Sequence, residues 1–395
     1  MVERQKIKIG LFGFGCVGTG LYEVLSKTPG FKADIVKICV KSRNKQRSLA
    51  AEYFTYNKED ILNDNSINVV VELIDDANAA WEIVSEAMKK GKAVVSANKK
   101  MIAEHFEELL QLQKQYDVPF LYEASCCASI PIIRNLEEYY DNDMLKQLTG
   151  IVNGSTNFIL TSCTGQGKPY VEALKNAQEL GYAESNPALD VEGFDAKYKL
   201  VILLAHAFGA VVKPEDVFNE GITRIGEQEI KYAREKGYKI KLLAKAVRNG
   251  ENGVNAYVMP AFVPASHQLY NIDDVFNGVI TETAFADKQV FVGRGAGSYP
   301  TASAVLSDIS ALTYLYRYEF KKLQQSQTEL SNDFDLDIYL RWDGNETSTV
   351  KTLFSDIHEQ FTGKTGRYIN GTIKFENITP LKNLLQDNYS IVALN

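Results

Sequence analysis

The chain has 395 residues, 45% hydrophobic and 24% charged, which is enough for two to three domains of roughly 150 residues and excludes a mainly disordered protein. Its 43 basic and 50 acidic residues give a net charge of −7, which argues against nucleic acid or an anionic membrane as partners. The longest nearly apolar stretch, 200–212, is too short to span a bilayer, and the charged N-terminus does not resemble a signal peptide. The five cysteines are an odd number, which argues against a framework of disulfide bonds. We therefore expect a cytoplasmic protein with reduced thiols.

The first 145 residues alternate short apolar runs with helix-length segments. Such β-branched runs separated by amphipathic helices predict βαβ units and a doubly wound parallel sheet of the Rossmann type. The predicted strands cover residues 7–12, 34–40, 68–74, 93–97 and 119–123, and the predicted helices cover residues 17–27, 79–90 and 101–116.

A glycine-rich motif follows the first predicted strand and opens the first predicted helix. Gly13 would make the tight turn, Gly15 would let the backbone approach a pyrophosphate, and Gly18 would let helix and strand pack closely. The phosphates would then lie at the positive end of the helix dipole. The predicted dinucleotide site comprises Gly13, Phe14, Gly15, Cys16, Val17 and Gly18.

The end of the second predicted strand indicates which dinucleotide is bound. An acidic side chain there would bind the ribose hydroxyl of NAD, but this chain has Val-Lys-Ser-Arg-Asn-Lys at 40–45. Cations pair strongly with phosphate oxygens, so Lys41 and Arg43 favour the 2′-phosphate of NADP. The alternative is that these are solvated loop cations and that NAD is also accepted.

Two further segments lie at the carboxyl ends of predicted strands, where open α/β sheets bind ligands. The first, 96–100, places Lys99 directly after the fourth strand. The second, 123–131, is rich in small residues, which allow a ligand or an ion to approach closely.

After residue 150 the pattern changes to helices at 171–180 and 194–208, strand-rich sequence from 239 to 292, a helix at 302–318 and a polar linker at 321–332. This predicts a second, α+β domain. Asp195 and Lys199 lie four residues apart and so share one helix face, which usually means a surface salt bridge. The apolar run 200–204 instead implies a buried helix, where desolvation would ease proton loss from Lys199 and make it a candidate general acid or base.

The last part of the chain has the pattern of a separate small unit. A strand at 336–341, a helix at 348–361, a hairpin at Asn370-Gly371, a helix at 380–386 and a strand at 389–394 give the order βαββαβ. This ferredoxin-like order is shared by ACT modules, which sense small molecules. An ACT-like regulatory or dimerising role and a plain structural cap both stay open.

We therefore predict three domains: 1–145, with 296–325 as a candidate to pack back on it, 146–325, and 326–395. No histidine pair has metal-ligand spacing, no Cys-x-x-Cys motif occurs and no Gly-x-Ser-x-Gly elbow is present. Neither a zinc site nor a serine hydrolase is expected.

Together, these segments resemble the homoserine dehydrogenase family. The motifs run in family order over about residues 6–320, at 13–18, 94–99 (Val-Val-Ser-Ala-Asn-Lys), 122–125, 130–132, 150–157 (Gly-Ile-Val-Asn-Gly-Ser-Thr-Asn), 177–184, 190–199, 207–209, 220–222 and 295–302. The resemblance implies an NAD(P)-dependent oxidoreductase that interconverts L-homoserine and L-aspartate 4-semialdehyde, a step toward threonine, methionine and isoleucine. It also implies a homodimer formed through the central catalytic domain, and some family members carry an ACT domain at the C-terminus.

The resemblance assigns roles to individual residues. Lys199 would exchange the proton of the substrate oxygen, oriented by Asp195, and Lys99 would lie between nicotinamide and substrate. Glu184 would bind the substrate amino group, with Asp190 nearby. Gly297 would approach the nicotinamide end of the cofactor. A monovalent cation such as sodium would be held through Glu123, Cys126, Ala128 and Ile130.

Two departures from the family pattern concern the cofactor and cation surroundings, where Cys-Cys-Ala-Ser at 126–129 and Asp-Asp at 75–76 replace glycine-containing turns. Two alternative functions remain. One is a non-catalytic nucleotide sensor, which the joint presence of Lys99, Glu184, Asp195 and Lys199 disfavours. The other is a different oxidoreductase such as aspartate-semialdehyde dehydrogenase, which requires a nucleophilic cysteine.

Overall fold

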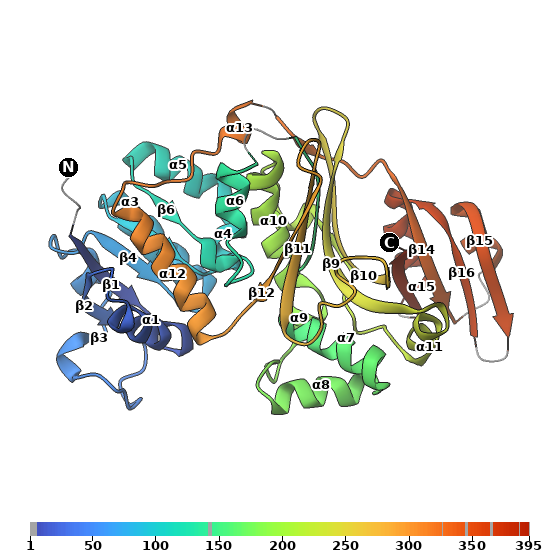
Figure 1. The fold of residues 1–395 in the computed structure, drawn as a ribbon, viewed down its shortest axis with the longest axis horizontal. Helices are drawn as coiled ribbons and strands as arrows, with labels where there is room; N and C mark the ends of the chain where they lie inside the picture. The colour runs from blue at the N-terminus through green and yellow to red at the C-terminus, as the bar shows by residue number, and fades with distance from the viewer. Residues whose placement is uncertain are drawn as a thin grey trace. The chain divides into compact units, whose positions relative to one another are not determined.

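The computed structural model describes residues 6–140, 144–325, 327–343, 347–363, 366–386 and 388–394, drawn as a ribbon in Figure 1. The chain divides into two compact units. Unit 1 comprises Met1–Asn142, Ala205–Lys213 and Gly293–Gln325, and unit 2 comprises Asp143–Leu204, Pro214–Val292 and Ser326–Asn395. Within the described ranges, no helix has both the length and the apolar character that a membrane span needs.

Unit 1 is built on a parallel six-stranded sheet with the order β3-β2-β1-β4-β5-β6. This is the Rossmann order, and it confirms the predicted parallel sheet. The strands are β1 (Ile7–Phe12), β2 (Ala33–Cys39), β3 (Phe54–Thr55), β4 (Val69–Glu72), β5 (Ala93–Ser96) and β6 (Phe120–Leu121). Only β3 was not predicted, because two residues give no periodicity.

The helices of unit 1 form two packed groups, α1 with α12 and α3 with α4 and α5. The pair α1 and α12 is tight, because a Cβ on Gly20 would lie 2.9 Å from the Ser298 carbonyl oxygen. The predicted helix 101–116 is in fact two helices that meet at His105, whose ring stacks on Trp81. The helices are α1 (Cys16–Lys27), α2 (Glu59–Leu62), α3 (Ala77–Lys89), α4 (Lys99–Glu104), α5 (Phe106–Tyr116), α6 (Ile132–Glu138), α12 (Ser298–Leu312) and α13 (Lys321–Gln325).

Two predictions near the end of unit 1 need correction. The helix predicted over 302–318 ends at Leu312, and Leu315 has a φ of +62°, which a helix cannot continue through. The stretch 321–332, predicted as a linker, contains α13 and the short strand β13 (Glu329–Leu330).

Unit 2 is built on a mixed eleven-stranded sheet, with the main order β12-β11-β7-β9-β10-β17-β14-β16-β15 and with β8 and β13 paired to β10. Helix α7 packs on β9, and α8 and α11 pack on α7. The first strands are β7 (Leu145–Ile151), β8 (Phe218–Asn219), β9 (Tyr238–Asn249), β10 (Gly253–Pro264), β11 (Phe276–Thr283) and β12 (Lys288–Arg294). The helices up to this point are α7 (Gly154–Gln166), α8 (Tyr170–Glu179), α9 (Ala188–Val191), α10 (Phe194–Phe208), whose last turn belongs to unit 1, and α11 (Glu227–Lys236).

The C-terminal part has the predicted element order βαββαβ, with the strands in the order β17-β14-β16-β15 and every neighbouring pair antiparallel. It is continuous with the rest of unit 2, because β17 pairs in parallel with β10, Ala393 opposite Ala261. The elements are β14 (Asp335–Trp342), α14 (Thr347–Thr352), β15 (Phe354–Gly363), β16 (Gly366–Lys374), α15 (Ile378–Leu385) and β17 (Tyr389–Leu394).

Two of the C-terminal predictions were wrong. The helix predicted over 348–361 stops at Thr352, and the chain continues as β15 because it pairs with β16. Asn370 and Gly371 do not turn the chain but lie inside β16. Strand β15 ends at Gly363, which pairs with Gly366, where β16 begins. Gly371 is needed for close strand packing, since a Cβ there would lie 2.2 Å from the Asp356 carbonyl oxygen.

Candidate functional site

The glycine loop in unit 1 has the geometry that its motif predicts. Gly13 has a φ of +94°, and a Cβ there would lie 2.5 Å from the Leu73 carbonyl oxygen. A Cβ on Gly18 would lie 2.3 Å from the Gly13 carbonyl oxygen, so both positions require glycine. A Cβ on Gly15, by contrast, would meet nothing within 4 Å, which leaves its backbone open on the side where α1 begins. The loop therefore exposes backbone at a helix N-terminus, the arrangement that binds phosphate.

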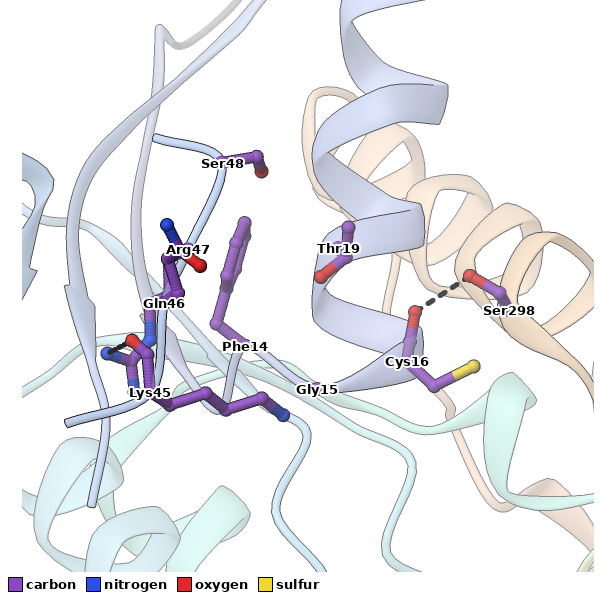
Figure 2. Close-up of a pocket in the computed structure, with 9 residues that line it drawn as sticks. All are labelled: Phe14, Gly15, Cys16, Thr19, Lys45, Gln46, Arg47, Ser48 and Ser298. Atoms are coloured by element: carbon purple, nitrogen blue, oxygen red, sulfur yellow. Dashed lines mark hydrogen bonds between the residues drawn. The ribbon is translucent and has the colours of Figure 1, made fainter. Parts of the chain in front are cut away.

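A pocket of about 390 Å³ lies beside this loop (Figure 2). In Figure 2 the Lys45 side chain extends toward the glycine loop, and the Ser298 hydroxyl donates a hydrogen bond to the Cys16 carbonyl. Basic and hydroxyl groups thus face the helix N-terminus across a space that admits an anion. The pocket is lined by Phe14, Gly15, Cys16, Thr19, Lys45, Gln46, Arg47, Ser48 and Ser298.

The cations predicted to select NADP do not line this pocket. Lys41 is exposed, and the exposed Arg43 lies with its guanidinium 4.6 Å from the centre of the Tyr56 ring. Arg47 instead folds the loop, since its guanidinium donates to the carbonyls of Lys45 and Ser42 at 2.9 and 2.6 Å. Sequence reasoning stopped at Lys45. The polar run Gln-Arg-Ser that follows at 46–48 was the signal that it missed.

A buried network fixes the backbone before Lys99. The Glu72 carboxyl, at the end of β4, accepts hydrogen bonds from the Ser96 hydroxyl at 2.6 Å and the Ile74 amide at 2.7 Å, and burial raises its pKa to about 7. The Asn98 amide donates to the Ser96 hydroxyl oxygen, and the Asn98 side chain caps α4, whose first residue is the half-buried Lys99. Sequence reasoning missed Glu72, because the predicted strand continued to residue 74; an acidic residue within an otherwise apolar run was the signal.

The residues predicted to hold a cation lie in the turn after β6. Both oxygens of the buried Glu123 carboxylate accept backbone amides at the start of α6, from Ile133 and Arg134 at 2.8 Å each. The Glu123 amide donates to Asp308, which also pairs with the Arg134 guanidinium at 2.8 Å. Burial raises the pKa of Glu123 to about 8 and that of Asp308 to about 7. Two buried carboxyl groups therefore lie at this turn, and the Arg134 guanidinium pairs with that of Asp308.

The backbone of this turn is unusual. Cys127 and Ala128 are consecutive residues with φ of +56° and +39°, in the left-handed region that favours glycine. Both residues are buried, as are Cys126 and Ile130. Among the described residues, no group of three or more His, Cys, Asp and Glu side chains could hold a metal ion.

Unit 2 holds the predicted lysine in a second buried network. The Lys199 ammonium donates to the Asp195 carboxylate and to the Val152 carbonyl, each at 2.7 Å. Lys199 is 6% exposed and Asp195 5%, which confirms that this pair is buried and not a surface salt bridge. The side chain of Asn153 donates to Asp195 at 2.9 Å and to Asp190 at 2.7 Å.

Asn153 is a site residue that sequence reasoning did not single out, although it lies in one of the quoted motifs. Its side-chain oxygen accepts the Thr156 amide and caps α7, so the helix start orients its amide nitrogen toward both aspartates. Glu184 is not part of this network; it lies exposed between α8 and α9. Gly297, in unit 1, precedes α12 with a φ of +124°, a conformation that only glycine adopts readily.

The comparisons with known proteins agree with this geometry. The NAD binding domain of homoserine dehydrogenase matches residues 13–123, and the homoserine dehydrogenase family matches residues 131–310. The homoserine dehydrogenase of Lactococcus lactis subsp. lactis is 38% identical over 314 residues, which cover 77% of this chain and 73% of that protein.

Solved structures extend the likeness to the C-terminus. A homoserine dehydrogenase from Thiobacillus denitrificans has a TM-score of 0.88 and 30% identity, covering 99% of this chain and 98% of that one. A hyperthermophilic archaeal homoserine dehydrogenase in complex with NADPH has a TM-score of 0.68 and 25% identity, covering 80% of this chain and 99% of that one. Neither alternative function is favoured by these matches, and this chain, an oxidoreductase acting on a CH–OH group, belongs to the homoserine dehydrogenase family.

Proposed function

We propose that this chain interconverts L-homoserine and L-aspartate 4-semialdehyde with NADP, and that Lys199 exchanges the proton of the substrate oxygen. The observation that carries the proposal is the buried Lys199 ammonium, held at 2.7 Å by both Asp195 and the Val152 carbonyl. A cation fixed in this way stabilises the charge that develops on the substrate oxygen, because it needs no reorientation during the reaction. The nicotinamide, when bound, supplies or accepts the hydride.

Two carboxylates are proposed to bind the substrate ammonium group. Asp190 is oriented by Asn153, the same side chain that contacts Asp195, so a substrate held by Asp190 would lie within the Lys199 network. Glu184, exposed in the loop before α9, is the second carboxylate. Opposite charge supplies affinity for the amino acid, while the buried pair acts on its hydroxyl.

On unit 1 we propose Lys99 as the second lysine of the reaction and Gly297 as the position that admits the nicotinamide end. Lys99 is supported by the Asn98 cap, which sets where α4 starts and hence where the lysine stem leaves the backbone. The glycine loop, residues 13–18, would hold the pyrophosphate.

NADP is the proposed cofactor, with NAD as the weaker one. The support is the basic lining of the pocket, Lys45 and Arg47, and the archaeal relative solved with NADPH. Lys41 and Arg43, which the sequence predicted as the contacts for the 2′-phosphate, become the second choice, because neither lines the pocket.

This choice is tested with Lys45→Met. Because the ammonium group pairs with the 2′-phosphate and NAD has none, we expect the KM for NADP to rise about tenfold and that for NAD to stay unchanged. Steady-state kinetics with both cofactors measures this. Equal changes for the two cofactors would contradict it, and a larger NADP effect in Lys41→Met or Arg43→Met would assign the contact to those residues.

A monovalent cation, sodium in the first instance, is proposed at the turn formed by residues 123–130. The donor set fits a hard cation, since it combines the Glu123 carboxylate with carbonyls of Cys126, Ala128 and Ile130. The Arg134 guanidinium pairs with Asp308, so a bound cation would supply the countercharge that holds Glu123 in its ionised form. Bound there, the ion would stabilise the turn that precedes α6.

A homodimer and an effector site complete the proposal. The C-terminal βαββαβ order is that of ACT modules, so an amino acid such as threonine or methionine is the proposed effector. A structural cap is the competing role.

The main test follows NADPH formation by absorbance with L-homoserine as substrate. We expect Lys199→Met to lower turnover at least about 100-fold, because the group that exchanges the proton of the substrate oxygen and stabilises its charge is lost, while the KM for NADP stays unchanged. The matched control is Lys197→Met, two residues earlier on α10, whose ammonium lies over the Phe194 ring and not on Asp195. Full turnover in Lys199→Met would overturn the assigned role, and an inactive wild type with either cofactor would overturn the function.

A further inference from the structure

Glu220 is a buried carboxylate outside the sites described above. It directly follows β8 and is only 4% exposed. Arg224 contacts one carboxylate oxygen at 3.1 Å, and Lys382 contacts the other at 2.7 Å. The Tyr389 hydroxyl donates to that second oxygen at 3.4 Å. Two of the three partners, Lys382 on α15 and Tyr389 on β17, thus come from the C-terminal elements.

The residues next to Glu220 are hydrogen-bonded to the end of α9. The Ile222 amide donates to the Val191 carbonyl at 2.7 Å, and the Asn219 side chain donates to the Glu192 carbonyl at 2.7 Å. Gly221 leaves no space between the segments, because a Cβ there would lie 2.3 Å from the Val191 carbonyl oxygen. A displacement of residues 219–222 therefore moves the backbone of residues 191–192.

Helix α9 leads from this contact to the Lys199 network. Asp190 precedes Val191 and accepts a hydrogen bond from Asn153, which also donates to Asp195. Asp195 in turn holds Lys199. A continuous series of close contacts therefore joins Lys382 in the C-terminal part to Asp190 and Lys199, all of it inside unit 2.

We propose that Glu220 is a positioning residue through which the C-terminal elements hold the substrate-binding segment of α9. A buried carboxylate must keep its charged partners, so loss of Lys382 leaves Glu220 to shift toward Arg224 or toward solvent. That shift displaces Gly221 and Ile222 and loosens Asp190. The inference rests on the proposed role of Asp190 in binding the substrate, and it gives residues 326–395 a task in the reaction that needs no effector.

The first experiment compares Lys382→Met with Lys382→Arg. The Lys382 ammonium nitrogen lies 4.9 Å from the centre of the Phe218 ring. Methionine keeps an apolar side chain beside this ring but removes the positive charge. We expect Lys382→Met to raise the KM for L-homoserine about threefold or more and to leave the KM for NADP unchanged. Lys382→Arg keeps the positive charge, so its KM for L-homoserine should lie close to that of the wild type. A merely structural role would lower kcat through loss of folded enzyme and leave both KM values unchanged, and that result would overturn the proposal.

The matched control is Lys374→Met at the end of strand β16, in the same C-terminal part, because Lys374 pairs only with Asp333 and Asp335 at the surface in the described contacts. It should behave as wild type. An equal rise of the homoserine KM in this control would also overturn the proposal, since any lost charge in the C-terminal elements would then suffice.

A second measurement does not depend on turnover. Amide hydrogen exchange in peptides covering residues 188–193 and 219–222 should become faster in Lys382→Met and in Tyr389→Phe, and stay unchanged in Lys374→Met. Unchanged exchange in the first two variants would overturn the inference. Faster exchange in a protein that does not oxidise homoserine would support the contact series and refute the proposed function, so the two failures are distinguishable.

Discussion

At the scale of single residues, the Glu72 carboxyl has the clearest physical consequence. It is fully buried at the end of β4, where the Ser96 hydroxyl and the Ile74 amide are its hydrogen-bond donors. Desolvation raises its pKa from 4.5 to about 7, so the fold favours the protonated form. The stability that this proton contributes is present below pH 4.5 and is lost as the pH rises through about 7.

This predicts a pH-dependent difference between wild type and Glu72→Gln. Glutamine resembles the neutral carboxyl group at every pH, so the free energy of unfolding of wild type should fall relative to the variant by about 3 kcal/mol between pH 4.5 and about pH 8. Urea unfolding followed by Trp81 fluorescence, with Trp342 replaced by Phe in both proteins, reports on unit 1. Parallel pH profiles of the two proteins would show that Glu72 does not titrate in this range.

Single residues also show what the sequence could and could not predict about the site. Asp195 and Lys199 were found because their spacing places them on one face and the apolar run after them implies burial. Asn153 was not, because its two carboxylate partners lie 37 and 42 residues away and no local pattern encodes such a contact. Arg47 was missed for a different reason: its contacts with Lys45 and Ser42 are local, but its part in the pocket depends on the irregular path of its own loop, which has no periodic pattern.

At the scale of elements, the glycine loop allows two requirements for glycine to be separated. Gly18 lacks space for any side chain within the protein itself, whereas Gly15 has open space on its Cβ side. The first is therefore a requirement of packing, and the second is a requirement of the bound cofactor.

Alanine at the two positions should have different effects. Gly18→Ala should lower the free energy of unfolding by about 1–3 kcal/mol, because the added methyl group meets the Gly13 carbonyl. Gly15→Ala should unfold at the wild-type temperature but raise the KM for NADP about tenfold, because the methyl group would lie where the pyrophosphate approaches. Thermal denaturation and steady-state kinetics measure the two effects. A destabilised Gly15→Ala protein with a normal KM would reverse the assignment.

The elements that the sequence predicted well are those with strong local periodicity. Strand β1 and helix α10 were predicted with the bounds that the structure shows, because each has a sustained apolar pattern. The residues of β15 fit a helix locally, and only pairing with β16 makes them a strand. Asn370-Gly371 is a turn signal by composition, but Asn370 pairs with Tyr339 in the middle of the sheet.

At the scale of the whole molecule, the C-terminal elements share a hydrophobic core with β10. Tyr257 and Met259 of β10 pack in one cluster with Ile338 and Leu340 of β14 and Leu381 of α15. Tyr257 is 4% exposed and Met259 is not exposed at all. Residues 326–395 therefore cover apolar surface that the rest of unit 2 would otherwise leave in water.

Deletion of residues 326–395 should accordingly destabilise unit 2. Exposing two large apolar side chains and unpairing β17 from β10 should lower the melting temperature by about 10 °C or more. Circular dichroism melts and the soluble yield of the shortened chain measure this. A truncated chain with the wild-type melting temperature and homoserine KM would instead show that the C-terminal part is an independent attachment.

The position of β17 also constrains the order of folding. It is synthesised after both of its neighbours, yet it lies inside the sheet, between β10 and β14. During translation the two neighbours of this strand have already emerged from the ribosome while their shared partner is still inside the exit tunnel. The nascent chain therefore has to keep two unpaired strand edges from joining each other, or other chains, until β17 has emerged as well.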